Sequence, residues 1–128
     1  MSRILLIEDD AVVRMTMAAM LADAGHSIVE AQNGIEGMAE MRRRRPELVI
    51  VDLIMPEQDG IETLIKLRAD HPDLPILAMS GGGRARNLDF LTLAAGFGAT
   101  RTLLKPFAPP SLLALVDECL TAARRPDE

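Results

Sequence analysis

The sequence predicts an α/β fold, a doubly wound five-stranded parallel sheet with strand order 2-1-3-4-5. Short apolar runs alternate with helical patterns along the whole chain, which gives five β-then-α units. The third apolar run is apolar at every position from Leu48 to Val51, as a central strand buried on both faces must be. Five such units imply a three-layer sandwich, a (βα)5 arrangement in which helices cover both faces of the sheet.

The individual elements follow from these patterns in order. Apolar, β-branched runs predict strands at 3–7, 27–31, 47–54, 75–80 and 101–105. Helices are predicted between and after them at 10–24, 35–44, 59–70, 86–96 and 110–124. Gly25 and Pro46 end the first two helices, and Pro109 and Pro110 suit the first turn of the last one.

Length and composition narrow the class of protein. The 128 residues fit one domain, expected at 1–124 with a short tail at 125–128, and 48% hydrophobic residues favour a packed core. The net charge of -5 argues against a nucleic-acid partner or an anionic membrane surface. No apolar run reaches the roughly 18 residues of a membrane span, and the start "MSRILLIEDD" turns acidic too soon for a signal peptide. We therefore expect a soluble, cytoplasmic protein. Its only cysteine, Cys119, excludes an internal disulfide and a multi-cysteine zinc site.

Polar residues gather where the predicted strands end. In open parallel sheets, ligands bind outside the carboxyl ends of the strands. With the order 2-1-3-4-5, strands 1, 3, 4 and 5 are neighbours, so their ends bring carboxylates, a hydroxyl and an ammonium to one edge. These residues are Glu8, Asp9 and Asp10 after strand 1, Asp52 in strand 3, Ser80 at the end of strand 4, and Lys105 with Pro106 at strand 5.

This set of side chains suits phosphoryl chemistry. Carboxylates at close range repel one another unless a cation lies among them, and an oxygen-rich site with an open side suits Mg²⁺. Lys105 and Ser80 are natural partners for phosphoryl oxygens. A carboxylate such as Asp52 can itself be the nucleophile, as in aspartyl phosphates, with the metal and the lysine offsetting the negative charge that develops.

Ordinary structural roles are the alternative for each residue taken alone. Asp9 or Asp10 would cap the first helix, Asp59 would cap the third, and Ser80 would be a turn residue. The convergence of five such residues at four strand ends favours a working site over these separate roles.

The same residues resemble the response-regulator receiver domain of two-component signalling, over nearly the whole chain. The motifs are "LLIEDD" (5–10), "VDLIMPEQDG" (51–60), "LAMS" (77–80) and "LLKPF" (103–107). The resemblance implies a flavodoxin-like fold with Asp52 as phosphoacceptor. It also implies Mg²⁺ held by Asp9, Asp52 and the backbone carbonyl of Ile54, with Glu8 helping through water. Ser80 and Lys105 would hold the phosphoryl group, and Pro106 would follow a cis peptide bond.

Two features depart from the pattern of the family. Between Ser80 and Lys105 lie about three more residues than is common, and we place the excess in the Gly-rich segment 81–87. Thr102 stands where the family often has Tyr or Phe, so rotation of an aromatic ring cannot report phosphorylation here. We therefore expect the response to phosphorylation to be read mainly as a rearrangement of 81–87 and the start of the following helix.

Three functions compete on this sequence. A stand-alone phospho-switch would accept a phosphoryl group from a histidine kinase or a histidine phosphotransfer protein and signal to an unknown protein target, as a monomer or weak dimer. A haloacid-dehalogenase-type phosphatase would carry Asp-x-Asp after strand 1, with the nucleophile there, whereas the candidate here is on strand 3. A degenerate receiver that only binds partners would not need the complete set of Glu8, Asp9, Asp52, Ser80 and Lys105. The first function, which is not that of an enzyme, is the prediction.

Overall fold

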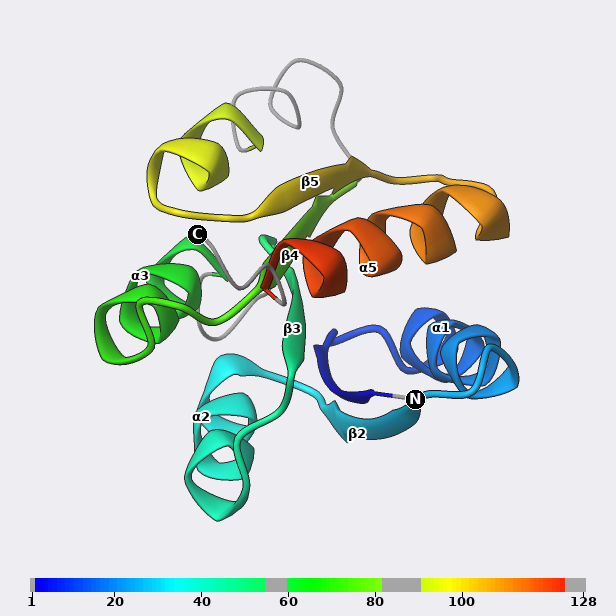
Figure 1. Cartoon of the computed structure of the whole chain (residues 1–128), viewed down its shortest axis with the longest axis horizontal. Coiled ribbons are helices and arrows are strands. Elements are labelled where there is room, and N and C mark those ends of the chain that lie inside the picture. The colour runs from blue at the N-terminus through cyan, green and yellow to red at the C-terminus, as the bar shows by residue number, and fades with distance from the viewer. Residues whose placement is uncertain (1, 55–59, 82–90, 124–128) are drawn as a thin grey trace.

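A computed structural model describes residues 2–54, 60–81 and 91–123 and confirms the predicted sheet (Figure 1). All neighbouring strands pair in parallel, in the order β2-β1-β3-β4-β5. The strands are β1 (Arg3–Ile7), β2 (Ser27–Ala31), β3 (Leu48–Asp52), β4 (Ile76–Ser80) and β5 (Arg101–Leu104). The helices are α1 (Ala11–Asp23), α2 (Gly34–Arg43), α3 (Gly60–Asp70) and α5 (Pro109–Ala123), and residues 91–96 are also helical.

Helices α1 and α2 each start one residue away from the predicted position, and a polar side chain caps each start. Helix α1 begins after Asp10, whose carboxylate accepts the N–H groups of Val12 and Val13 at 2.9 and 3.1 Å. Helix α2 likewise begins after Asn33, whose side chain accepts the Glu36 N–H at 2.8 Å. The predicted helix at 86–96 is described only from residue 91, and Asp59, a predicted cap, also lies outside the described residues.

The third strand is shorter than the predicted 47–54. Its ladder ends at Asp52, although Leu53 still donates its N–H to the Met79 carbonyl at 2.8 Å. The Leu53 carbonyl instead accepts the N–H of Gly60, at 3.1 Å, so α3 starts directly against the end of β3. The two strand ends at Pro75 and Lys105 were also predicted one residue too far out.

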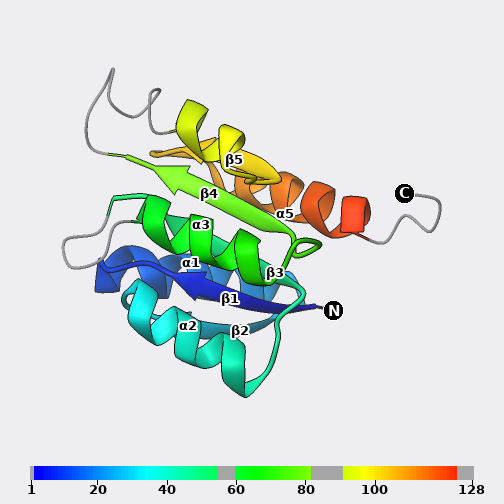
Figure 2. The same ribbon diagram turned by 90° about the vertical axis from the view of Figure 1, so that its left-hand side faces the viewer.

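Two apolar layers hold the helices on the sheet. Helices α1 and α5 cover one face, where Met17 and Leu21 of α1 and Val116 and Leu120 of α5 belong to the same buried apolar cluster. Helices α2 and α3, with residues 91–96, cover the other face (Figures 1 and 2). Every residue of β3 is buried, as its uninterrupted apolar sequence predicted. Fully burying each such aliphatic side chain contributes about 1.5–3 kcal/mol, so this strand contributes substantially to the stability of the fold.

The parallel register brings the strand ends to one edge. Ile7 of β1 pairs with Val51 of β3, so Glu8 and Asp52, the next residues along each chain segment, lie beside each other. Ser80 at the end of β4 pairs with Leu104 of β5, which places Lys105 at the same edge. Among the described residues, no helix has the length and apolar character needed to cross a membrane.

Candidate functional site

Glu8 is a carboxylate buried at the centre of this edge. It follows β1 directly and is only 1% exposed. Its backbone N–H donates to the Ala31 carbonyl at 3.0 Å, and its Oε2 accepts the backbone N–H of Asp10 at 3.2 Å. Its Oε1 accepts a hydrogen bond from Lys105 Nζ at 2.5 Å. Both oxygens of the Glu8 carboxylate are therefore held by hydrogen bonds, and its backbone is held separately.

Asp52 is the second buried carboxylate, 5% exposed at the last position of β3. Its Oδ1 accepts the N–H of Ile54 at 3.2 Å, and its Oδ2 accepts Lys105 Nζ at 3.3 Å. The backbone N–H of Lys105 donates to the Ser80 carbonyl at 2.7 Å, which anchors the lysine on β4. One ammonium thus serves two carboxylates that the chain buries.

Asp9 completes the acidic cluster and is its exposed member. One oxygen from each of Glu8, Asp9 and Asp52 lies within 4.8 Å of the others. Burial raises the pKa of Glu8, the hydrogen bond from Lys105 opposes this, and the charge of Asp52 adds to the rise. Burial and the neighbouring Glu8 also raise the pKa of Asp9. For Lys105, burial lowers the pKa, but the hydrogen bond to Glu8 and the charge of Asp52 outweigh it, so the pKa is raised overall.

The composition of the cluster fits a divalent cation. Three carboxylates and one ammonium leave a charge of minus two when all are ionised, and a divalent cation would balance it. The ligand atoms are oxygens, and Asp9 leaves one side of the cluster open to water, a combination that suits Mg²⁺. Residues Glu8, Asp9 and Asp52 are therefore able to hold such an ion.

The remaining predicted site residues occupy the same edge. Ser80 is fully buried at the end of β4, next to the strand that leads into Lys105. Ile54 lies two residues beyond Asp52, and its N–H contacts that carboxylate. The peptide bond between Lys105 and Pro106 is cis, as the resemblance implied. The roles of Ser80 and Ile54 toward a phosphoryl group and a metal stay predictions.

Sequence reasoning did not identify the residues that pack against the backbone or stems of the site residues. A Cβ on Gly60 would lie 2.1 Å from the Asp52 carbonyl oxygen, so a side chain has no space there. A Cβ on Gly81 would lie 2.8 Å from the Lys105 Cβ. Arg14 of α1 donates from Nη1 to the Glu8 carbonyl at 2.8 Å. The motif "QDG" gave the only signal for Gly60, and the close approach itself is visible only in three dimensions.

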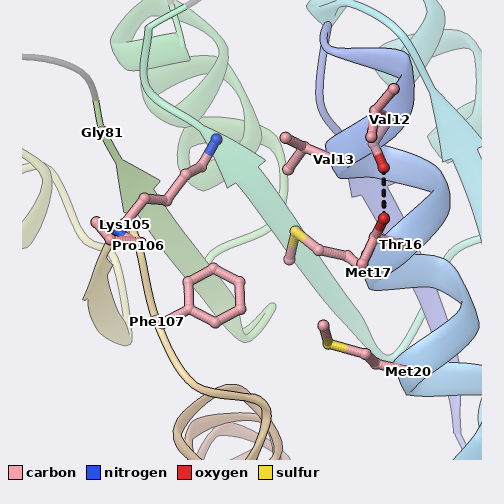
Figure 3. A pocket seen from close by; sticks show the side chains of 9 residues that line it. All are labelled: Val12, Val13, Thr16, Met17, Met20, Gly81, Lys105, Pro106 and Phe107. Atoms are coloured by element: carbon pink, nitrogen blue, oxygen red, sulfur yellow. Dashed lines mark hydrogen bonds between the residues drawn. The ribbon is translucent and has the colours of Figure 1, made fainter.

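An apolar pocket of about 450 Å³ opens beside the cluster (Figure 3). In Figure 3, Val12, Val13 and Met17 on α1 face Lys105 and Phe107 across the pocket. Lys105 lines this pocket and also hydrogen-bonds Asp52, so this one side chain links the pocket to the acidic cluster.

Segments 55–59 and 82–90 lie outside the described residues, so the predicted rearrangement of 81–87 stays a prediction. Thr102 is partly buried on β5 and pairs with Ala78 of β4.

Comparisons with protein families, with curated proteins and with solved structures all find response regulators or receiver domains. The family model "Response regulator receiver domain" matches residues 4–117. Response regulator MprA of a Mycobacterium species is 36% identical over 98% of this chain and 53% of its own length. The receiver domain of NtrX from Brucella abortus superposes with a TM-score of 0.87 at 29% identity, covering 92% of this chain and 98% of that one. A CheY-like receiver domain protein of Methanospirillum hungatei gives 0.86 at 25% identity, covering 96% of each chain.

The chain spans about half the length of the curated mycobacterial relatives it matches. Receiver domains are signalling switches and are generally not catalytic enzymes. The family match over residues 4–117, the shared fold and the acidic cluster agree with one another. This chain belongs to the response regulator receiver domains of two-component signalling.

Proposed function

We propose that this chain is a phosphorylation-dependent switch in which Asp52 accepts a phosphoryl group from a histidine kinase or a histidine phosphotransfer protein. The observation that carries the proposal is a buried carboxylate at a strand end that contacts Lys105 and lies within an acidic cluster. The signal then passes by contact with a protein target or by onward phosphotransfer.

The residues divide the chemistry between them. Asp52 attacks the phosphorus of a phosphohistidine, the P–N bond breaks, and the imidazole leaves with the electron pair and takes up a proton. The Lys105 ammonium, already hydrogen-bonded to Asp52 Oδ2, offsets the charge of the transferred oxygens. The Ser80 hydroxyl is proposed as a second phosphoryl partner. Glu8, Asp9, Asp52 and the Ile54 carbonyl are proposed to hold Mg²⁺, which when bound supplies a Lewis acid for the phosphoryl oxygens.

The donor protein is proposed to approach over the apolar pocket. Lys105, which hydrogen-bonds Asp52, lines this pocket together with Val12 and Phe107. Val12 is 74% exposed, so an apolar side chain is available to a partner at the entrance to the site.

We also propose the setting in which the switch works. The domain is proposed to span 1–124, with a tail at 125–128. A cytoplasmic location and a monomer or weak dimer are also proposed, and the net charge of -5 is consistent with a protein that stays in solution. No nucleic-acid or membrane contact is proposed for this chain, because a negative net charge disfavours anionic partners.

The test is phosphorylation by acetyl phosphate with Mg²⁺, followed by intact-mass measurement. The parent protein should gain one base-labile phosphate, and Asp52→Asn should gain none while remaining folded. Asp117→Asn, an exposed carboxylate on α5, is the matched control and should label like the parent. Labelling of Asp52→Asn at the parent rate would overturn the assignment.

A further inference from the structure

Arg14 connects three elements behind the acidic cluster. Its Nη1 donates to the backbone carbonyl of Glu8 at 2.8 Å, and its Nε donates to Glu30 Oε1 at 3.2 Å. The side chain of Arg14 is 17% exposed, whereas that of Glu30 is 41% exposed. Arg14 lies on α1 and Glu30 on β2, so the guanidinium joins both elements to the turn that follows β1.

The hydrogen bond from Arg14 to the Glu8 carbonyl restrains the backbone of the next residue, Asp9. That carbonyl and the Asp9 N–H belong to one planar trans peptide unit, so holding the oxygen fixes the plane and the direction in which the Asp9 backbone leaves it. Glu8 and Asp52 are held by burial and by Lys105. Asp9 is exposed, so packing holds its carboxylate less than it holds the other two, and its position depends on its hydrogen bonds with Glu8 and its own backbone and on the direction of that backbone.

We propose that Arg14 is a positioning residue for the divalent-cation site, holding the Glu8–Asp9 peptide so that the Asp9 carboxylate stays within reach of Asp52. The inference rests on the proposed function, because it takes Asp9 and Asp52 as metal ligands. Arg14 contacts Glu30 and the Glu8 carbonyl, and it is not proposed as a ligand of the metal or of the phosphoryl group. It acts through the backbone of Asp9, which is proposed as a metal ligand.

Charge and positioning predict opposite results when Arg14 is removed. A nearby positive charge repels a cation, so loss of charge alone would strengthen the binding of every divalent ion. Loss of positioning would instead weaken binding, and would weaken Mg²⁺ more than Ca²⁺. Mg²⁺ demands near-ideal octahedral geometry, whereas Ca²⁺ accepts flexible and irregular sites. The ratio of the two affinities therefore reports geometry and is insensitive to net charge.

The experiment measures Mg²⁺ and Ca²⁺ dissociation constants of the full chain by titration calorimetry, and melting temperatures by circular dichroism. Arg14→Gln should lose about tenfold in Mg²⁺ affinity, the lower end for partners that orient a ligand, with a smaller loss for Ca²⁺. Arg14→Lys, which keeps one donor, should recover part of the Mg²⁺ preference. Glu30→Gln leaves the bond to the Glu8 carbonyl and should keep the affinity ratio.

A matched control separates positioning from general loss of an arginine. Arg101 of β5 also pairs with a glutamate, Glu118 of α5, at the same 3.2 Å, and it also donates to a backbone carbonyl, that of Thr100, at 2.8 Å. Arg101→Gln should leave both metal affinities unchanged, and its melting temperature shows what the loss of such an ion pair costs without any effect on the cluster. Equal strengthening of Mg²⁺ and Ca²⁺ in Arg14→Gln, or an unchanged ratio, would overturn the inference about Arg14 alone. Absence of Mg²⁺ binding in the parent protein would overturn the proposed metal site together with it.

Discussion

Lys105 is the cation on which two buried carboxylates depend, and its removal gives a sharp test of the site. In Lys105→Met the aliphatic stem remains and packs as before, but the ammonium is lost. Glu8 Oε1 and Asp52 Oδ2 then lose the partner that contacts them at 2.5 and 3.3 Å. Each carboxylate keeps one backbone N–H, from Asp10 and from Ile54 respectively.

The size of the loss follows from burial. Side-chain exposure is 1% for Glu8, 6% for Asp52 and 19% for Lys105, so water screens these charges poorly. Removing one partner of a buried ion pair costs about 3–5 kcal/mol. Without metal, we expect Lys105→Met to lower the free energy of unfolding by about 3 kcal/mol. This is the lower end of the range, because a buried carboxyl can take up a proton instead of staying charged.

The pH dependence has a definite sign. The pKa of Glu8 is already raised above its ordinary value of 4.5, chiefly by burial, and loss of Lys105 removes the hydrogen bond and charge that oppose the rise. A carboxyl whose pKa is higher in the folded state destabilises the fold above that pKa, and the cost disappears as the pH falls toward 4.5. The difference in unfolding free energy between Lys105→Met and the parent protein should therefore become smaller as the pH falls from neutral to about 5. Mg²⁺ should also reduce the difference, because without the ammonium the carboxylates attract the cation more strongly, so binding stabilises the variant more than the parent.

Urea unfolding followed by far-ultraviolet circular dichroism is the assay, since the chain has no Trp or Tyr. Lys66→Met is the control, because Lys66 pairs with Glu62 at a similar 3.2 Å but both side chains are more than half exposed. Such a pair contributes about 0.3–0.5 kcal/mol. Equal destabilisation by the two substitutions, or a deficit in Lys105→Met that acid does not reduce, would refute the reasoning.

Three further outcomes follow from the same geometry. Asp9→Ala should abolish most Mg²⁺ binding measured by calorimetry without lowering stability, since Asp9 is exposed; retained affinity would count against the metal site. Gly60→Ala should lower the free energy of unfolding by about 1–3 kcal/mol, because its Cβ would strike the Asp52 carbonyl. Gly96→Ala, with no atom within 4 Å of its Cβ, should be neutral in the same urea titration, and similar losses would contradict the packing argument. Burial raises the pKa of Cys119 to about 11, so the folded protein should resist iodoacetamide at pH 8 until urea unfolds it; rapid labelling in native buffer would argue against a buried thiol.

The fold was predictable because its determinants are local patterns read along the chain. β3 is apolar at four consecutive positions and is buried throughout, so its central place follows from composition alone. Placing Glu8, Asp52 and Lys105 together needed only the strand order, since each stands at or just after a strand end. Asp10 shows the limit of this reasoning, because it caps α1 while its neighbour Asp9 joins the cluster.

The finer contacts were not predictable because they join residues far apart in sequence at distances set by packing. Lys105 and Glu8 are 97 residues apart, and nothing local indicates that the ammonium lies closer to Glu8 than to Asp52. The bond from Arg14 to the Glu8 carbonyl depends on how α1 lies against β1. The need for glycine at 60 arises from the meeting of α3 with the end of β3.

The buried charges explain why this edge is both costly and useful. Two carboxylates in a nearly water-free setting repel each other, and the fold offsets the cost with one lysine that neutralises only part of the charge. A cluster with two uncompensated negative charges favours any cation or cationic arrangement that completes it. A change of charge at Asp52 therefore alters the balance that holds Lys105, and through the Lys105 N–H bond to the Ser80 carbonyl that balance is connected to the end of β4. If Asp52 accepts a phosphoryl group as proposed, the same electrostatic stress that lowers stability would give the site a means of responding to it.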